Sequence, residues 1–223
     1  MTHELNRRVL LKTLGAVAAE AALSRSSFAE PGTDSASKPL LGLFPIGQTP
    51  FTLDDKLDFD CLAAEVKFCN RASVPGFIWP QIASGWSTLT TSERFAGTEA
   101  ILAAGKGGKT ALVIGVQTQN NDLSGAIAFA KHAAQHGADA ICSLPPTGDD
   151  AAMLSYYKAI GSATDLPLFV QTIGDMSVEL IVAMFRSIPT MRVVKDEAGD
   201  PLARITEIRQ KTADKLEIGR AHV

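Results

Sequence analysis

Residues 111–144 read ALVIGVQTQNNDLSGAIAFAKHAAQHGADAICSL and contain one complete strand–helix–strand unit. The runs 111–116 and 140–144 are apolar at nearly every position, which is typical of parallel strands covered on both faces. Residues 124–136 between them carry the apolar spacing of an amphipathic helix. A strand, a helix and a second strand in this order predict a right-handed crossover and a parallel sheet.

The same alternation continues along the chain outside this unit. Short apolar runs predict further strands, and longer patterns between them predict helices. The full set of predicted strands is 40–46, 77–79, 111–116, 140–144, 168–171 and 192–195. The predicted helices are 58–71, 92–104, 124–136, 149–164, 177–187 and 201–212.

A doubly wound sheet and a barrel both fit this order of elements. The loop after the first predicted strand, PIGQTP at 45–50, lacks the glycine pattern that cradles a pyrophosphate in a doubly wound dinucleotide-binding sheet. The sequence therefore favours an α/β fold of the (β/α)8 TIM-barrel type. Residues 39–217 supply about six βα units, so the predicted barrel is incomplete.

The composition limits the classes of partner. The chain has 223 residues, of which 46% are hydrophobic and 20% are charged, as expected for one folded domain. Its net charge is −3, and no basic run interleaved with aromatic residues is present, so we expect no nucleic-acid partner. Cys61 and Cys69 are eight residues apart on one predicted helix, too far along its axis to form a disulfide. We expect these two and Cys142 to be reduced and buried as small hydrophobic residues.

Residues 1–29 have the composition of an export signal. The stretch NRRVLLK at 6–12 resembles a twin-arginine signal, a small apolar segment follows at 9–23, and SFA at 27–29 suits a signal peptidase. Residues 30–38 then predict a linker. We expect a periplasmic or otherwise exported protein that uses the twin-arginine export machinery. About 15 apolar residues are too few for a membrane span, so none is expected in the mature chain.

Four motifs along the predicted barrel resemble one known family. They are TPF at 49–51, STLTTSER at 87–94, GADA at 137–140 and VKDEAGD at 194–200. Together they resemble the dihydrodipicolinate synthase and N-acetylneuraminate lyase family over nearly all of residues 40–210. That resemblance implies a TIM barrel and places Lys195 where the family forms a Schiff base.

A lysine at this position suits imine chemistry. At the carboxyl end of a barrel strand, an apolar interior disfavours the ammonium and favours the neutral, nucleophilic amine. Such an amine attacks a ketone, and the resulting imine acts as an electron sink. The alternative is a solvated Lys195 that pairs with Asp196 or Glu197.

Other positions depart from the family pattern. Gln171 stands where the family has a proton-relaying tyrosine, and an amide cannot serve as a general acid or base. Met176 replaces the arginine that holds a substrate carboxylate, and QIASG at 81–85 replaces the carboxylate-binding Gly-Thr-Thr-Gly-Glu loop. Thr147 and Gly148 replace a tyrosine pair. Authentic dihydrodipicolinate synthesis is therefore not expected.

The predicted function is a lyase or aldolase that forms a Schiff base between Lys195 and a small 2-oxo acid or related carbonyl compound. The alternative is a non-catalytic exported barrel that binds a metabolite or partner. The predicted catalytic residues are Lys195 and Gln171. The predicted substrate-binding residues are Gln81, Ser84, Trp79 and Thr172.

We expect neither an organic cofactor nor a metal. His132 and His136 are four residues apart on a predicted helix, but the metalloprotease glutamate between them is missing and the sequence offers no evident third ligand. Residues 218–223, IGRAHV, match a sequencing-adapter reading frame and are predicted to be non-native. Without a seventh and eighth strand, we expect a C-terminally truncated family member, whose complete form is compatible with a homo-oligomer.

Overall fold

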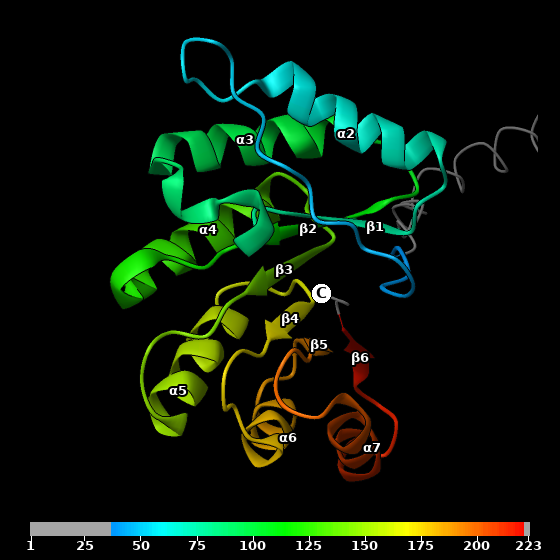
Figure 1. Ribbon diagram of the computed structural model, residues 1–223, viewed down its shortest axis with the longest axis vertical. Helices are drawn as coiled ribbons and strands as arrows, with labels where there is room; N and C mark the ends of the chain where they lie inside the picture. Colours follow the sequence, from blue (N-terminus) through cyan, green and yellow to red (C-terminus); the bar gives the residue numbers. More distant parts are fainter. Residues whose placement is uncertain (1–36, 221–223) are drawn as a thin grey trace, which may run out of the picture. The chain divides into compact units, whose positions relative to one another are not determined.

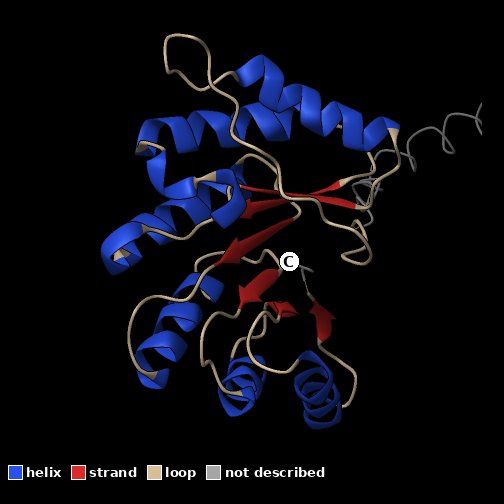
Figure 2. Cartoon of the chain, in the orientation of Figure 1, coloured by secondary structure: helices blue, strands red, loops and turns tan. Residues whose placement is uncertain are grey.

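Residues 37–220 are described by the computed structural model, and they contain one parallel sheet with helices along its outer face (Figure 1). Six strands pair in the order β1-β2-β3-β4-β5-β6, and every pairing is parallel. The sheet curves into a partial barrel, and Figure 2 shows its helices outside the strands. The prediction of an incomplete TIM barrel is thus confirmed. The predicted export signal and most of the linker lie outside the described residues.

The elements alternate along the chain as the sequence predicts. The strands are β1 (Gly76–Trp79), β2 (Ala111–Gly115), β3 (Ala140–Ser143), β4 (Leu168–Gln171), β5 (Met191–Lys195) and β6 (Glu217–Gly219). The helices are α2 (Phe59–Arg71), α3 (Thr91–Ala104), α4 (Leu123–Gln135), α5 (Asp150–Gly161), α6 (Val178–Ser187) and α7 (Pro201–Thr212). Short 3-10 helices η1 (Ile82–Ser84), η2 (Trp86–Thr88) and η3 (Gln119–Asn121) lie in the loops that follow β1 and β2.

Each α-helix in the described chain begins at a residue that caps it. A side-chain oxygen at the N-cap accepts a hydrogen bond from a backbone N–H of the first turn, which otherwise has no partner within the helix. The capping residues are Asp58, Thr90, Asp122, Asp149, Ser177 and Asp200. These caps fix where each helix starts after the preceding strand or loop.

Alternation along the strands divides the buried side chains into two sets. One large cluster lies between the sheet and the helices. A smaller cluster lines the inner face of the sheet and consists of Ile78, Val113, Ala140, Cys142, Phe169 and Val193. Successive side chains of a strand point to opposite faces, so the parity of a position decides whether it faces the barrel interior or the helices.

A close backbone contact holds the carboxyl ends of β1 and β2 together. A Cβ atom at Gly115 would lie 1.9 Å from the Pro80 carbonyl oxygen, so only glycine fits. The same carbonyl accepts a 2.9 Å hydrogen bond from Gln117 Nε2. Arg94 of α3 donates to the carbonyls of Gly115, at 2.6 Å, and Gln117. Burial lowers the pKa of the Arg94 guanidinium to about 10, which still leaves it charged at neutral pH.

The predicted first strand, 40–46, is wrong. This segment runs beside β1 and makes hydrogen bonds to it, including Ile78 N to Pro45 O at 3.0 Å, but only Ile46 forms a bridge, with Ile78. Pro45 has no N–H to donate, and Gly42 has a left-handed φ of 92°, so a regular ladder does not form. Leu40 and Phe44 nevertheless pack against the inner cluster.

The sixth strand, β6, was not predicted. It pairs with β5 through Val193 with Glu217, Val194 with Ile218 and Lys195 with Gly219. The strand crosses the predicted boundary at residue 217, so the barrel portion of the chain extends to residue 219. The predicted foreign origin of residues 218–223 stays a prediction.

Two further expectations concern membranes and cysteines. Among the helices of residues 37–220, none combines the length and apolar character needed to cross a membrane. All three cysteines are free, as predicted. Cys69 and Cys142 are buried, but Cys61 is exposed, because its position in the first turn of α2 faces away from the sheet.

Candidate functional site

Lys195 is the last residue of β5 and lies on the inner face of the sheet. Val193, two residues earlier, belongs to the inner cluster, and strand alternation gives Lys195 the same direction. Its side chain is 16% exposed. Together with Ile78, Phe169 and Val193, Lys195 lines a cavity of about 470 Å³ on the inner side of the sheet. The predicted nucleophile therefore opens onto a largely apolar cavity.

Glu197 joins Lys195 to Gln171 at the carboxyl ends of β5 and β4. Lys195 Nζ lies 3.0 Å from Glu197 Oε1, and Gln171 Nε2 donates to Glu197 Oε2 at 2.5 Å. Gln171 and Lys195 are register partners across the two strands. The ion pair places a proton acceptor next to the amine, and the Gln171 amide fixes the other carboxylate oxygen.

A buried network positions the backbone of Glu197. Its N–H donates to Thr172 Oγ1 at 2.8 Å, and that hydroxyl donates to Asp196 Oδ1 at 2.8 Å. Arg204 of α7 donates from Nε to Asp196 Oδ2 at 3.0 Å and from Nη2 to Asp196 Oδ1 at 2.9 Å. Asp196 is fully buried, so this two-pronged pairing supplies the partners that the charge requires.

Cys142 of β3 lies on the same inner face and is fully buried. Burial raises the pKa of its thiol to about 12, and the positive charge of Lys195 offsets part of that rise. The thiol therefore stays protonated at neutral pH, which makes it a poor nucleophile.

Gln81, which follows β1, offers an unused amide. Its side chain is 1% exposed, and neither Nε2 nor Oε1 has a hydrogen-bond partner among the described residues. Gln171 Oε1 is likewise buried without a partner there. Buried amide groups are normally paired, so these atoms are exceptions among the described residues, and neither glutamine lines the Lys195 cavity. The predicted roles of Gln81 and Gln171 stay predictions.

Three of the predicted site residues have other contacts. Trp79 is fully buried on the helix side of the sheet, where its ring packs at Gly97 of α3 and its Nε1 donates to Thr49 Oγ1 at 3.1 Å. The prediction of substrate binding by Trp79 is wrong, because Ile78 rather than Trp79 has the inward parity. Ser84 Oγ donates to the Gly47 carbonyl at 2.6 Å.

Ser84 and Thr172 therefore act on the protein itself. The Ser84 hydroxyl also accepts from the Gln81 backbone N–H at 3.1 Å, which fixes the loop that carries the Gln81 amide. The Thr172 hydroxyl is used by Asp196 and Glu197. Neither hydroxyl faces the Lys195 cavity as a lining group, so their predicted substrate contacts are replaced by positioning contacts.

Tyr157 of α5 is the buried phenol that reaches the strand ends. Its hydroxyl donates to the Ser143 carbonyl at 2.9 Å and lies 3.2 Å from the Gln171 carbonyl oxygen. Burial raises the pKa of Tyr157 well above its ordinary value. This tyrosine ties β3 to β4 from the helix side and does not replace the family's proton-relaying tyrosine.

The chain is similar in sequence to one family of known proteins. Residues 39–219 match the model of the dihydrodipicolinate synthetase family. The 4-hydroxy-tetrahydrodipicolinate synthase of Methanosarcina mazei is 28% identical over 181 residues, which are 78% of this chain and 60% of that protein. An uncharacterized DapA-like lyase of Halobacterium salinarum is 30% identical over 170 residues, which cover 72% of this chain and 54% of the relative. The chain thus spans at most 60% of the length of these relatives.

Solved structures show the same fold. YagE of Escherichia coli K12, a dihydrodipicolinic acid synthase family protein in complex with pyruvate, superposes with a TM-score of 0.74 at 21% identity, covering 82% of this chain and 64% of YagE. N-acetylneuraminate lyase of Mycoplasma synoviae gives 0.71 at 23% identity, with coverage of 80% and 62%. Since the family model covers most of the chain, the chain belongs to the dihydrodipicolinate synthetase family.

Proposed function

We propose that this chain carries the active-site half of a Schiff-base lyase or aldolase that acts on a small 2-oxo acid or related carbonyl compound. The contact between Lys195 Nζ and Glu197 Oε1, at 3.0 Å on the inner face of the barrel, carries the proposal. It joins a nucleophile to a proton acceptor within hydrogen-bond reach, which covalent catalysis by an amine requires.

Glu197 takes the place of the missing tyrosine in this proposal. The carboxylate accepts a proton from the Lys195 ammonium, and the neutral amine attacks the substrate carbonyl carbon. A proton shifts from nitrogen to oxygen in the adduct to give the carbinolamine, its hydroxyl leaves as water with the proton returned from Glu197, and the protonated imine remains. The Gln171 amide donates to Glu197 and holds it in place without transferring a proton itself.

The lining of the cavity favours a small substrate. Ile78, Phe169 and Val193 form apolar walls, and the charged residues Lys195, Glu217 and Arg220 also line the cavity. The family's carboxylate-binding arginine is replaced by Met176, which is buried. We therefore propose that aspartate semialdehyde is not the second substrate. The pyruvate in the YagE structure makes pyruvate the first compound to test.

Borohydride trapping tests the proposal. The protein is incubated with pyruvate and other 2-oxo acids, reduced, and digested, and the Lys195 peptide is analysed by mass spectrometry. A reduced adduct is expected on Lys195 and is lost in Lys195→Ala, whereas Lys158→Ala, an exposed lysine of α5, keeps it. Glu197→Gln is expected to slow adduct formation by about 10²- to 10⁴-fold, the usual contribution of a general acid–base group.

A second candidate function is a barrel that binds a metabolite without reacting. The observation that favours it is the lining of the cavity, which includes Lys195 but neither Glu197 nor Gln171. Thermal stabilisation by a 2-oxo acid without any reduced adduct would support this second function. It would also contradict the lyase proposal.

We also propose that the protein is exported through the twin-arginine route to the periplasm. The support is the sequence NRRVLLK at 6–12 and the apolar segment that follows. Cell fractionation of the wild-type protein and of the double variant Arg7→Lys, Arg8→Lys tests it. Export is expected only for the wild type, and equal export of both would contradict the proposal.

A further inference from the structure

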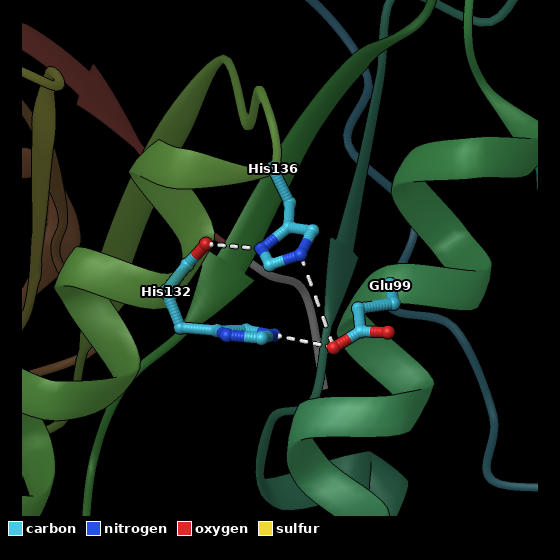
Figure 3. A group of neighbouring side chains, drawn as sticks. All are labelled: Glu99, His132 and His136. Atoms are coloured by element: carbon cyan, nitrogen blue, oxygen red, sulfur yellow. Dashed lines mark hydrogen bonds and ion pairs between the residues drawn. The ribbon is translucent and has the colours of Figure 1, made fainter.

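Two histidines and a glutamate converge between helices α3 and α4. His132 lies in the last turn of α4, His136 is its C-cap residue, and Glu99 faces them from α3 (Figure 3). One oxygen, Glu99 Oε1, lies 3.3 Å from His132 Nε2 and 3.9 Å from His136 Nε2. The ligand atoms of all three residues lie within 4.8 Å of one another. The two histidines are the donors visible in the sequence, and the fold adds Glu99 as the third.

The hydrogen bonds fix which ring nitrogen of His136 is available. His136 Nδ1 lies 2.9 Å from the His132 carbonyl oxygen. A carbonyl only accepts, so Nδ1 carries the proton, and the neutral ring presents a lone pair at Nε2. Metal-binding histidines are commonly oriented in this way by a carbonyl bonded to the other nitrogen.

The second histidine is also held in place. The His132 ring packs edge-on against Phe95, with ring centroids 4.6 Å apart, and its Nε2 is buried without a hydrogen-bond partner among the described residues. The 3.3 Å contact with Glu99 Oε1 is therefore close in distance but is not aligned as a hydrogen bond. Two nitrogen atoms and a carboxylate oxygen thus lie within 4.8 Å of one another, and the two imidazole rings lie side by side with centroids 4.1 Å apart.

We propose that Glu99, His132 and His136 form a binding site for a divalent transition metal, with zinc as the ion that suits it best. In a tetrahedral zinc site with bond lengths of about 2.0–2.1 Å, neighbouring ligand atoms lie roughly 3.3 Å apart. The spacing of 3.3 and 3.9 Å needs only small side-chain movements to match. Two imidazoles and one carboxylate are also a common ligand set for zinc.

The site is separate from the Lys195 cavity. His136 lies four residues before β3 begins, at the amino-terminal edge of the sheet, whereas Lys195 ends β5 at the opposite edge. A bound ion would connect α3 to α4 and thereby stabilise the packing of two neighbouring βα units. Glu99 and His136 are exposed, so the ion has access from solvent and keeps a position for water.

Zinc binding to the full 223-residue chain is measured by competition with a chromophoric chelator and by thermal melting with and without zinc. One zinc ion per chain and a higher melting temperature are expected. Glu99→Gln and His136→Ala are each expected to lower the zinc affinity by at least about 100-fold, the upper end of the cost of losing an outer-shell partner. Circular dichroism confirms that each variant is folded.

Two control variants distinguish this site from adventitious binding. Gln135→Ala changes the exposed neighbour of His136, and Cys61→Ser removes the exposed thiol. Both are expected to keep wild-type zinc affinity. The proposal is overturned if equimolar zinc does not bind, or if binding survives in Glu99→Gln and His136→Ala. Borohydride trapping at Lys195 is expected to be the same with and without zinc, so the two proposals fail independently.

Discussion

Replacing Arg204 by methionine would leave a buried carboxylate without its main partner. Arg204 donates through Nε and Nη2 to the two oxygens of Asp196, which is fully buried. In Arg204→Met, the carboxylate keeps only the hydroxyl of Thr172, at 2.8 Å. The methionine side chain has a similar length, so the change removes the charge and the donors with little loss of packing.

The magnitude follows from the burial of the pair. Removing one partner of a buried ion pair costs about 3–5 kcal/mol. Arg204 is 15% exposed, so water reaches part of the space that it vacates, and the lower end, about 3 kcal/mol, is expected. With a urea dependence of about 2 kcal/mol per M, the midpoint of unfolding should fall by about 1.5 M.

Urea unfolding followed by circular dichroism measures this loss. Arg204→Met, Asp196→Asn and the double variant form a cycle that isolates the interaction from the effects of each substitution alone. We expect a coupling energy of about 2 kcal/mol. A coupling energy below about 0.5 kcal/mol would refute the reasoning, because the pair would then contribute no more than an exposed ion pair.

Three further predictions concern other parts of the fold. The backbone N–H and hydroxyl of Thr90 lower the pKa of the Glu93 carboxyl, so the capping box should stabilise the protein at neutral pH and be lost as the pH falls through the folded-state pKa. Thr90→Ala should cost about 1 kcal/mol at neutral pH and less in acid, as measured by urea unfolding at both pH values. Gly115→Ala should lower stability by about 3 kcal/mol because its Cβ meets a backbone carbonyl, and an unchanged melting temperature would contradict the contact. Because burial raises the pKa of Cys142 to about 12, iodoacetamide at mildly alkaline pH should label Cys61 alone until denaturant is added, as read by mass spectrometry.

The sequence predicts most of the sheet because its central strands are covered on both faces. Residues 111–116, 140–144 and 168–171 are apolar runs, and the observed strands match them to within one residue at either end. The segment 40–46 has the same apolar character, but Pro45 removes a donor that a ladder requires. β6 is three residues long and carries no apolar run that would distinguish it from a loop.

The sequence predicts which strand ends carry Lys195 and Gln171. Lys195 and Gln171 are inward-facing register partners, as the family resemblance implies. The prediction that Trp79 contacts substrate rests on its place at a strand end. Its position in the alternation of the strand makes its side chain face the helices instead. Glu197 was weighed only as a partner of a solvated lysine. Its spacing of two residues from Lys195 was the available signal, since such residues share a side of an extended chain.

Lys195 and Glu197 come from the same strand end, two residues apart. Their separation is therefore set by one short stretch of backbone, which Thr172 and the Asp196–Arg204 pair hold from behind. The loops after β1, β2 and β3 contain neither Lys195 nor Glu197, and the first of these loops carries Gln81. Under the proposed function, insertions or substitutions in those loops would alter which carbonyl compound is accepted and leave the Lys195–Glu197 pair unchanged. In such a scaffold, selection for a new substrate proceeds without rebuilding the reactive centre.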